Sequence, residues 1–265
     1  MATVNEVYGF LDKLAPFDLQ MDFDNAGFLV GRGETQVKRL LVALDITLPV
    51  AEEAAEKGCQ LVVSHHPVIF HPVKALTDQS ATGRVLLALA EGHMAAICAH
   101  TNLDAAEGGV NDQLAKRLGL TDIALLEQDG TDRWGRPYGI GRIGRVHAPG
   151  LSGAEYAAYV KEKLNANSVR FEDAGVPVSR VAVGGGSCGS MLADVAAKGC
   201  DTFVTADVKY DVFLSALDMG INLIDAGHYA TENVVCPVLA ELIAKVFPQM
   251  EVLLSAEHEE VYRDV

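Results

Sequence analysis

The stretch Leu61-Val62-Val63-Ser64-His65-His66-Pro67 decides how this chain is interpreted. Its short apolar run is typical of a strand buried on both faces of a parallel sheet. Pro67 has no backbone N–H to give to a neighbouring strand, so we expect the strand to end before it. His65 and His66 then lie at the carboxyl end of the strand, which is the edge where open α/β sheets bind ligands.

Apolar runs alternate with amphipathic segments over most of the 265 residues, which predicts βαβ units and a largely parallel sheet. The expected strands are Arg39–Ile46, Gln60–Val63, Ala95–Ala99, Arg180–Val183, Thr202–Thr205 and Ile221–Ile224. The expected helices are Val4–Leu14, Pro49–Lys57, Thr82–Gly92, Val110–Leu118, Ala154–Leu164, Met191–Lys198, Tyr210–Met219 and Glu232–Val246.

A Gly-rich segment, Arg136–Val146, interrupts this alternation in the middle of the chain. Its alternating apolar residues predict one or two antiparallel strands, and its glycines predict bends or bulges. The turn cluster Gln128–Asp132 just before it predicts a boundary near 128–135. We therefore expect an α/β protein with two βαβ-rich lobes, residues 1–130 and 131–265.

Composition excludes several classes of protein. The chain is 49% hydrophobic and 22% charged, which excludes a disordered chain and allows a large core. A net charge of −15 without a run of Lys or Arg argues against direct nucleic-acid binding. No apolar stretch reaches the roughly 18 residues of a membrane span, and the N-terminus lacks the pattern of a signal peptide. The five scattered cysteines are typical of reduced thiols, so we expect a cytoplasmic protein.

The pair His65 and His66 has two interpretations. Adjacent side chains on a strand point to opposite faces, so the two imidazoles would each reach a different ion lying across the strand end. For an isolated pair, two imidazoles satisfied within a loop are the simpler interpretation.

Two further strand ends carry comparable residues. His100, Asn102 and Asp104 follow one expected strand and would face the same way if the chain stays extended; alternatively, Asp104 caps the following helix. His228 and Glu232 follow another strand and would share a face of a helix that begins at His228. The alternative there is an ordinary first turn, in which Thr231 caps the helix and the helix dipole favours Glu232.

Taken together, these strand ends offer imidazoles and carboxylates that should line one cleft. The mixed nitrogen and oxygen set suits Zn, Fe, Mn or Co better than Ca or Mg. Five protein ligands are too many for one open tetrahedral site. They fit two ions about 3.5–4 Å apart with a bridging carboxylate. The five candidates are His65, His66, Asp104, His228 and Glu232.

A glycine loop after the strand Arg180–Val183 has three interpretations. The glycines at 184, 186 and 189, followed by Asp207, satisfy a dinucleotide-binding pattern, although a run of glycines produces this spacing easily. The N–H groups of Gly184, Gly185 and Gly186 could instead hold a substrate phosphate. The third interpretation is a tight turn without a ligand. Lys209 is a further candidate for substrate binding, and Cys188 lacks the nearby His that a catalytic thiol needs.

The sequence resembles the NIF-three-like family of dinuclear-metal proteins, type-2 homologues of GTP cyclohydrolase I. The segments that carry the resemblance span nearly the whole chain: Asp24–Gly31, Ser64–Phe70, Ala99–Asp104, Gly184–Ser187 and Asp225–Glu232. The resemblance implies two divalent ions on the five candidates above, with Glu232 as a bridge and His100 as a neighbouring group. It also implies a toroidal homohexamer, and the chain is too short for the inserted domain that some members carry.

Two functions follow as hypotheses. The first is a metal-dependent hydrolase acting on a nucleotide-type substrate, by ring opening as in a GTP cyclohydrolase or by phosphoester hydrolysis. In it, His100 shuttles a proton, while Asn102, Lys209 or the glycine loop positions the substrate. The second is a non-catalytic, metal-dependent regulator or scaffold.

Overall fold

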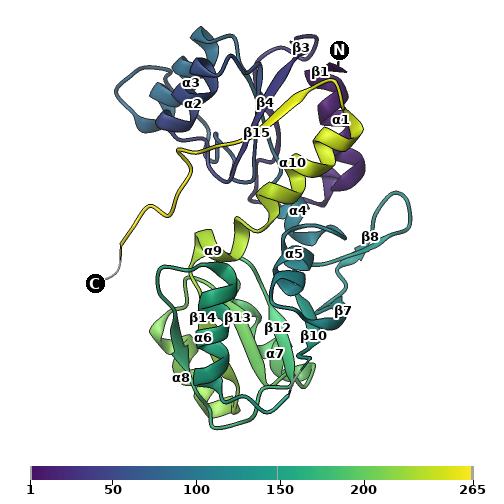
Figure 1. The fold of residues 1–265 in the computed structure, drawn as a ribbon, viewed down its shortest axis with the longest axis vertical. Coiled ribbons are helices and arrows are strands. Elements are labelled where there is room, and N and C mark those ends of the chain that lie inside the picture. The colour runs from purple at the N-terminus through teal and green to yellow at the C-terminus, as the bar shows by residue number, and fades with distance from the viewer. Residues whose placement is uncertain (1, 148, 264–265) are drawn as a thin grey trace. The chain divides into compact units, whose positions relative to one another are not determined.

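The structure is a computed structural model, which describes residues 2–147 and 149–263 (Figure 1). The chain forms two compact units. Unit 1 contains the residues up to Leu103 together with Cys236–Glu259, and unit 2 contains Asp104–Val235 together with the residues from Glu260 onward. Among the described residues, no helix is long and apolar enough to cross a membrane.

Unit 1 is built on a five-stranded sheet in the order β15-β4-β5-β6-β2. The first four strands are parallel, and β2 is antiparallel to β6. The strands are β15 (Glu251–Leu254), β4 (Arg39–Ala43), β5 (Leu61–Ser64), β6 (Ala95–Cys98) and β2 (Gly27–Val30), and a separate pair joins β1 (Ala2–Thr3) to β3 (Gln36–Val37).

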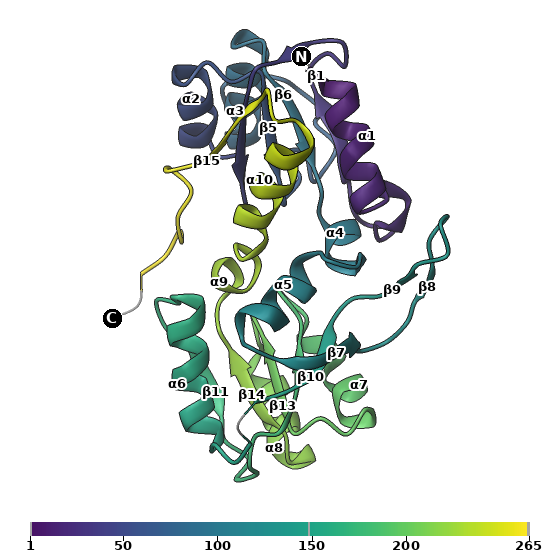
Figure 2. The ribbon, with the colours of Figure 1, turned by 45° about the vertical axis from the view of Figure 1, so that its right-hand side comes forward.

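Helices cover both faces of this sheet. In Figures 1 and 2, α2 (Leu48–Glu56) and α3 (Ala81–Glu91) lie on one side, while α1 (Val4–Leu14) and α10 (Val235–Val246) lie on the other. A short 3-10 helix, Phe17–Leu19, follows α1. The first three helices begin where a hydroxyl caps the first turn, since the side chain of Thr3, Thr47 or Ser80 accepts a backbone N–H of its helix.

Unit 2 is built on a six-stranded mixed sheet in the order β11-β14-β13-β12-β10-β7. The strands β12, β13 and β14 are parallel, and the other pairings are antiparallel. Their bounds are β7 (Thr121–Leu125), β10 (Arg142–Arg145), β11 (Arg170–Glu172), β12 (Arg180–Val183), β13 (Thr202–Thr205) and β14 (Asn222–Asp225), with a separate hairpin of β8 (Gly130–Thr131) and β9 (Pro137–Tyr138).

Two apolar clusters fill the two sides of this sheet, one around Tyr156 and one around Phe203. The helices of unit 2 are α5 (Val110–Arg117), α6 (Gly153–Leu164), α7 (Leu192–Ala197), α8 (Tyr210–Met219) and α9 (His228–Glu232), with a 3-10 turn at Gly189–Met191. The chain passes from unit 1 to unit 2 within α4 (Thr101–Ala105).

The α/β class with parallel strands is confirmed, and the boundary between the units differs from the expected one. Residue 130 lies inside unit 2, because β7 and β10 on either side of the turn cluster pair within one sheet. The segment Cys236–Glu259 belongs to unit 1, where β15 pairs with β4. The antiparallel strands expected in the Gly-rich segment are present as β9 and β10.

Two local expectations need correction. The segment after β6 is the helix α4 and is not extended, because the carboxylate of Asp24 accepts both the N–H and the hydroxyl of Thr101 at the start of the helix. The helix expected from Glu232 to Val246 is divided into α9, which ends at Glu232, and α10.

Candidate metal centre

The carboxyl ends of β5 and β6 bring three histidines together in unit 1. His65 and His66 follow β5, and His100 follows β6, as the strand-end argument predicts. The ring centroids of His65 and His66 are 5.0 Å apart, and that of His100 lies 5.1 Å and 5.5 Å from the two. Each ring offers a nitrogen within 4.8 Å of the other two. His65 is fully buried, so the cluster is part of the folded interior and does not consist only of surface side chains.

Each of these rings is oriented by an oxygen acceptor at Nδ1. A carbonyl or carboxylate oxygen can only accept, so Nδ1 carries the proton and Nε2 keeps its lone pair. Metal-ligating histidines are held in this way, because the Nδ1 contact fixes both the tautomer and the ring orientation. The contacts are His65 Nδ1 to Ala99 O at 2.8 Å, His66 Nδ1 to Asp45 Oδ1 at 2.7 Å and His100 Nδ1 to Asp24 Oδ1 at 2.8 Å.

Asp24 is held in its charged form although it lies among buried groups. Burial by itself would raise the pKa of this carboxyl, but hydrogen bonds from His100 and Thr101 outweigh it and lower the pKa to about 2. Asp24 is therefore ionised at neutral pH. It orients the ring of His100 and also holds the first turn of α4.

In unit 2, α9 brings His228 and Glu232 together. His228 Nε2 lies 3.0 Å from Glu232 Oε2, as expected for residues four apart on one helix. The Nδ1 atom of His228 lies 2.6 Å from Asp207 Oδ2, so an oxygen acceptor orients this ring too. The site therefore offers an imidazole nitrogen and a carboxylate oxygen side by side.

The helix-start explanation of Glu232 does not hold. Glu232 is the last residue of α9, where the helix dipole disfavours a negative charge, and its side chain is only 3% exposed. Thr231 does not cap the helix either, because its hydroxyl donates to carbonyls of the preceding turn and accepts the N–H of Gly186. A buried carboxylate in this position requires a positive partner.

The glycine loop packs against Glu232. Gly186 has a φ of +65°, and a Cβ at this position would lie 2.1 Å from Glu232 Oε1. All three glycine N–H groups are used within the protein: they donate to Val204 O, Asn111 Oδ1 and Thr231 Oγ1. The structure thus favours the tight-turn interpretation, in which the missing side chains make room for a carboxylate.

Asp104 approaches the same loop from α4. Asn111 links the two, since its amide donates to the backbone oxygen of Asp104 and its oxygen accepts the N–H of Gly185. Burial and, to a smaller extent, the nearby charges of Asp104 and Glu232 together raise the pKa of the Cys188 thiol to about 12. Cys188 is therefore a neutral thiol beside two carboxylates, not an activated nucleophile.

The two remaining candidates have different surroundings. Asn102 is fully buried, its oxygen accepts the N–H of His100, and its amide donates to Ala15 O. Its polar atoms therefore hold the backbone around the histidines. Lys209 is exposed and directly precedes α8.

The donor set within each unit, taken by itself, fits a divalent transition-metal ion. Imidazole nitrogens with anchored Nδ1 atoms and buried carboxylates are the ligands that Zn, Fe and Mn prefer. The residues that sequence reasoning missed are the three aspartates that orient the rings, Asp24, Asp45 and Asp207. The sequence contained a signal for two of them, namely an aspartate just beyond the end of a buried strand. Asp45 lies two residues after the end of β4, and Asp207 lies two residues after the end of β13.

Comparison with known proteins identifies the family and agrees with the fold. The model of the Duf34/NIF3 (NGG1p interacting factor 3) family matches residues 2–260. A Streptomyces coelicolor protein named GTP cyclohydrolase 1 type 2 homolog is 36% identical over 236 residues, which cover 88% of this chain and 82% of the relative. A Helicobacter pylori protein named GTP cyclohydrolase 1 type 2 is 32% identical over 246 residues, 92% of each chain. The crystal structure of a Staphylococcus aureus hypothetical protein matches with a TM-score of 0.93 and 30% identity over 99% of both chains.

Proposed function

Because the chain belongs to the Duf34/NIF3 family, we propose that it binds two divalent metal ions and hydrolyses a nucleotide-type substrate with them. The proposed ligands are His65, His66, Asp104, His228 and Glu232. Glu232 is the proposed bridging carboxylate, and Zn, Fe and Mn are the candidate ions.

The observation that carries the proposal is the arrangement of four histidines, each with its Nδ1 atom facing an oxygen acceptor. Histidines that serve only for packing in a core would not be expected to have four contacts from Nδ1 to an oxygen acceptor near buried carboxylates. The carboxylate–imidazole pairs also raise the basicity of the ring and thereby strengthen a metal bond.

Divalent ions supply Lewis-acid polarisation of a substrate and lower the pKa of water. The side chains of the protein have their own tasks. An ionised Asp24 holds His100 at Nδ1, so Nε2 is the ring atom placed to accept a proton and release it again. Buried Asn102 keeps the backbone N–H of His100 in place.

The substrate class rests on the names of the relatives. The Helicobacter pylori relative is named GTP cyclohydrolase 1 type 2, so GTP and its ring opening at an imidazole carbon come first among substrates to test. A phosphoester is the second target, because paired ions stabilise both oxygens of an in-line displacement.

The test is to purify the protein with Mn, Zn or Fe and to assay GTP and a panel of phosphoesters. His65→Ala and Glu232→Ala should each remove the activity. His93→Asn serves as a matched control, because His93 is an exposed histidine with a φ of +54°, which Asn tolerates. Activity that survives both alanine variants would contradict the proposal. Metal binding without any turnover would favour the metal-dependent scaffold instead.

We also propose that the chain assembles as a toroidal homohexamer. An exposed apolar stripe on α8 supports self-association: Tyr210, Leu214 and Leu217 are 78%, 52% and 50% exposed at helical spacing. A stripe of this kind is costly to leave in water, and a second copy of the chain would cover it.

A further inference from the structure

A pocket of about 320 Å³ lies beside His66 in unit 1, and the metal proposal makes no use of most of it. It opens at the carboxyl edge of the sheet, between the loop after β4, the loop after β5 and the start of α3. Its lining residues are Asp45, Ile46, Thr47, Leu48, His66, Pro67, Val68, Ala81, Thr82, Arg84 and Val85. Ligands of open α/β sheets bind at this edge.

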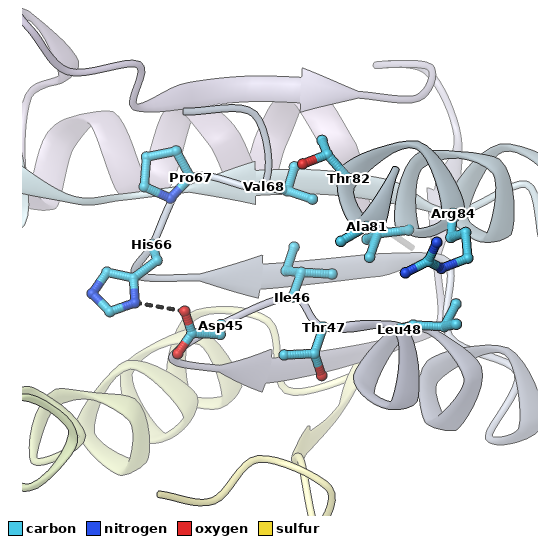
Figure 3. A pocket seen from close by; sticks show the side chains of 11 residues that line it. Asp45, Ile46, Thr47, Leu48, His66, Pro67, Val68, Ala81, Thr82 and Arg84 are labelled. Atoms are coloured by element: carbon cyan, nitrogen blue, oxygen red, sulfur yellow. Dashed lines mark hydrogen bonds and ion pairs between the residues drawn. The ribbon is translucent and has the colours of Figure 1, made fainter. Parts of the chain in front are cut away.

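The two ends of the pocket differ in chemistry. Figure 3 shows His66 and Asp45 at one end and Arg84 at the other, with its guanidinium group turned toward the middle. The apolar side chains of Ile46 and Val68 lie between them. A ligand that fills the pocket therefore has an apolar middle and a different polar group at each end.

Arg84 is a cation without a carboxylate partner among the described residues, in a chain whose net charge is −15. The only described hydrogen bond of its guanidinium group runs from Nη1 to the backbone oxygen of Asp78, 3.0 Å away. This contact leaves Nε and Nη2 to donate elsewhere. A guanidinium in such a position matches the geometry of an oxyanion.

The start of α3 adds further donors to the lining of the same pocket. The hydroxyl of Ser80 accepts the N–H of Gly83, so the first turn keeps the N–H groups of Ala81 and Thr82, for which no described residue supplies an acceptor. Ala81 and Thr82 both line the pocket, and Thr82 contributes a hydroxyl as well. Hydroxyl, amide and guanidinium donors together suit a group with three acceptor oxygens better than one with two.

We propose that this pocket binds the phosphate end of a small phosphorylated substrate at Arg84, Ala81 and Thr82, and presents its other end to His66. The orientation toward His66 rests on the metal site proposed above, whereas phosphate binding at Arg84 stands without it. The pocket volume lies at the lower end of small-molecule sites, so it takes a phosphate with one ring-sized apolar group.

The test is titration calorimetry of the purified protein with phenyl phosphate, before and after treatment with a chelator. Arg84→Met should weaken binding about tenfold or more in both states, because a charged donor is lost. Ala81→Phe, an exposed position at the pocket rim, should block binding while the helix still forms. The matched control is Arg117→Met, since Arg117 is another exposed arginine whose described contact is a single backbone oxygen.

Three outcomes would overturn the proposal. The first is unchanged binding in Arg84→Met, and the second is benzoate binding as tightly as phenyl phosphate. The third is binding that disappears with the chelator but survives Arg84→Met, which would place the phosphate on the metal ions. A wild-type protein that holds no metal would refute the proposed function, yet the contrast between Arg84→Met and Arg117→Met would still decide whether the pocket takes phosphate.

Discussion

The Oδ1 atom of Asp45 lies 2.7 Å from Nδ1 of His66, and this contact joins the end of β4 to the end of β5. The carboxylate holds the proton on Nδ1, so Nε2 is the ring nitrogen of His66 that keeps its lone pair. The position of one proposed ligand therefore depends on a residue that does not itself bind the ion.

Replacing this carboxylate tests the dependence. Asp45→Asn should weaken metal binding about 10–100-fold, because an amide no longer fixes the tautomer and does not raise the basicity of the ring. Competition with a metal-sensing dye measures the affinity. Asp218→Asn, an exposed aspartate on α8, should leave it unchanged. Equal affinities for both variants would mean that Asp45 does not orient His66.

The Asp24–His100 pair predicts a pH dependence of stability. Because the folded-state pKa of Asp24 is lowered from 3.8 to about 2, its stabilising contribution is present above pH 3.8 and is lost as the pH falls toward 2. Asp24→Asn should lower the free energy of unfolding by about 1–2 kcal/mol at pH 7, with a difference that shrinks below pH 4. Urea unfolding of both proteins at several pH values measures this. A difference that stays constant with pH would show that the charge of Asp24 is not the cause.

The close approach of Gly186 to Glu232 predicts a specific loss. Gly186→Ala places a Cβ 2.1 Å from Glu232 Oε1 at a φ of +65°, so it should displace the carboxylate and reduce the metal content. Gly175→Ala is the matched control, because Gly175 has a φ of +74° and nothing within 4 Å of an added Cβ. That variant should lose about 1 kcal/mol from backbone strain alone. Metal analysis and thermal unfolding separate the two effects, and full metal content in Gly186→Ala would contradict the role given to Glu232.

The α8 stripe predicts the effect of a surface charge on assembly. Leu214→Glu with Leu217→Glu should lower the molecular mass of the particle, because buried charges oppose association of apolar surfaces. Ser215→Glu adds a charge at an exposed position of the same helix and should have a smaller effect. Light scattering measures the mass. A double variant with the mass of the wild type would place the interface elsewhere.

Some of this molecule could be predicted from its sequence because the signal is local. A short apolar run that ends in polar residues marks a buried parallel strand, and this rule placed His65, His66 and His100 at strand ends. The edge strands β7 and β15 were not predicted, because the apolar runs within them, Ile123–Leu125 and Val252–Leu254, are only three residues long and none of their residues is fully buried.

The remainder depends on contacts between distant parts of the chain. Thr101 begins a helix because Asp24, far away in sequence, accepts its N–H. The residues near Thr101 in the sequence do not predict this contact. The carboxylates that orient the histidines come from other loops for the same reason. The pocket at Arg84 likewise exists only once the sheet has brought two loops and a helix together.

The central claim is that the chain binds two divalent ions, and metal analysis of the freshly purified protein tests it most directly. We expect close to two ions per chain in the wild type, and clearly fewer in each of the variants His65→Ala and Glu232→Ala while His93→Asn keeps the full content. A wild-type protein without bound metal, or alanine variants that retain both ions, would contradict the account.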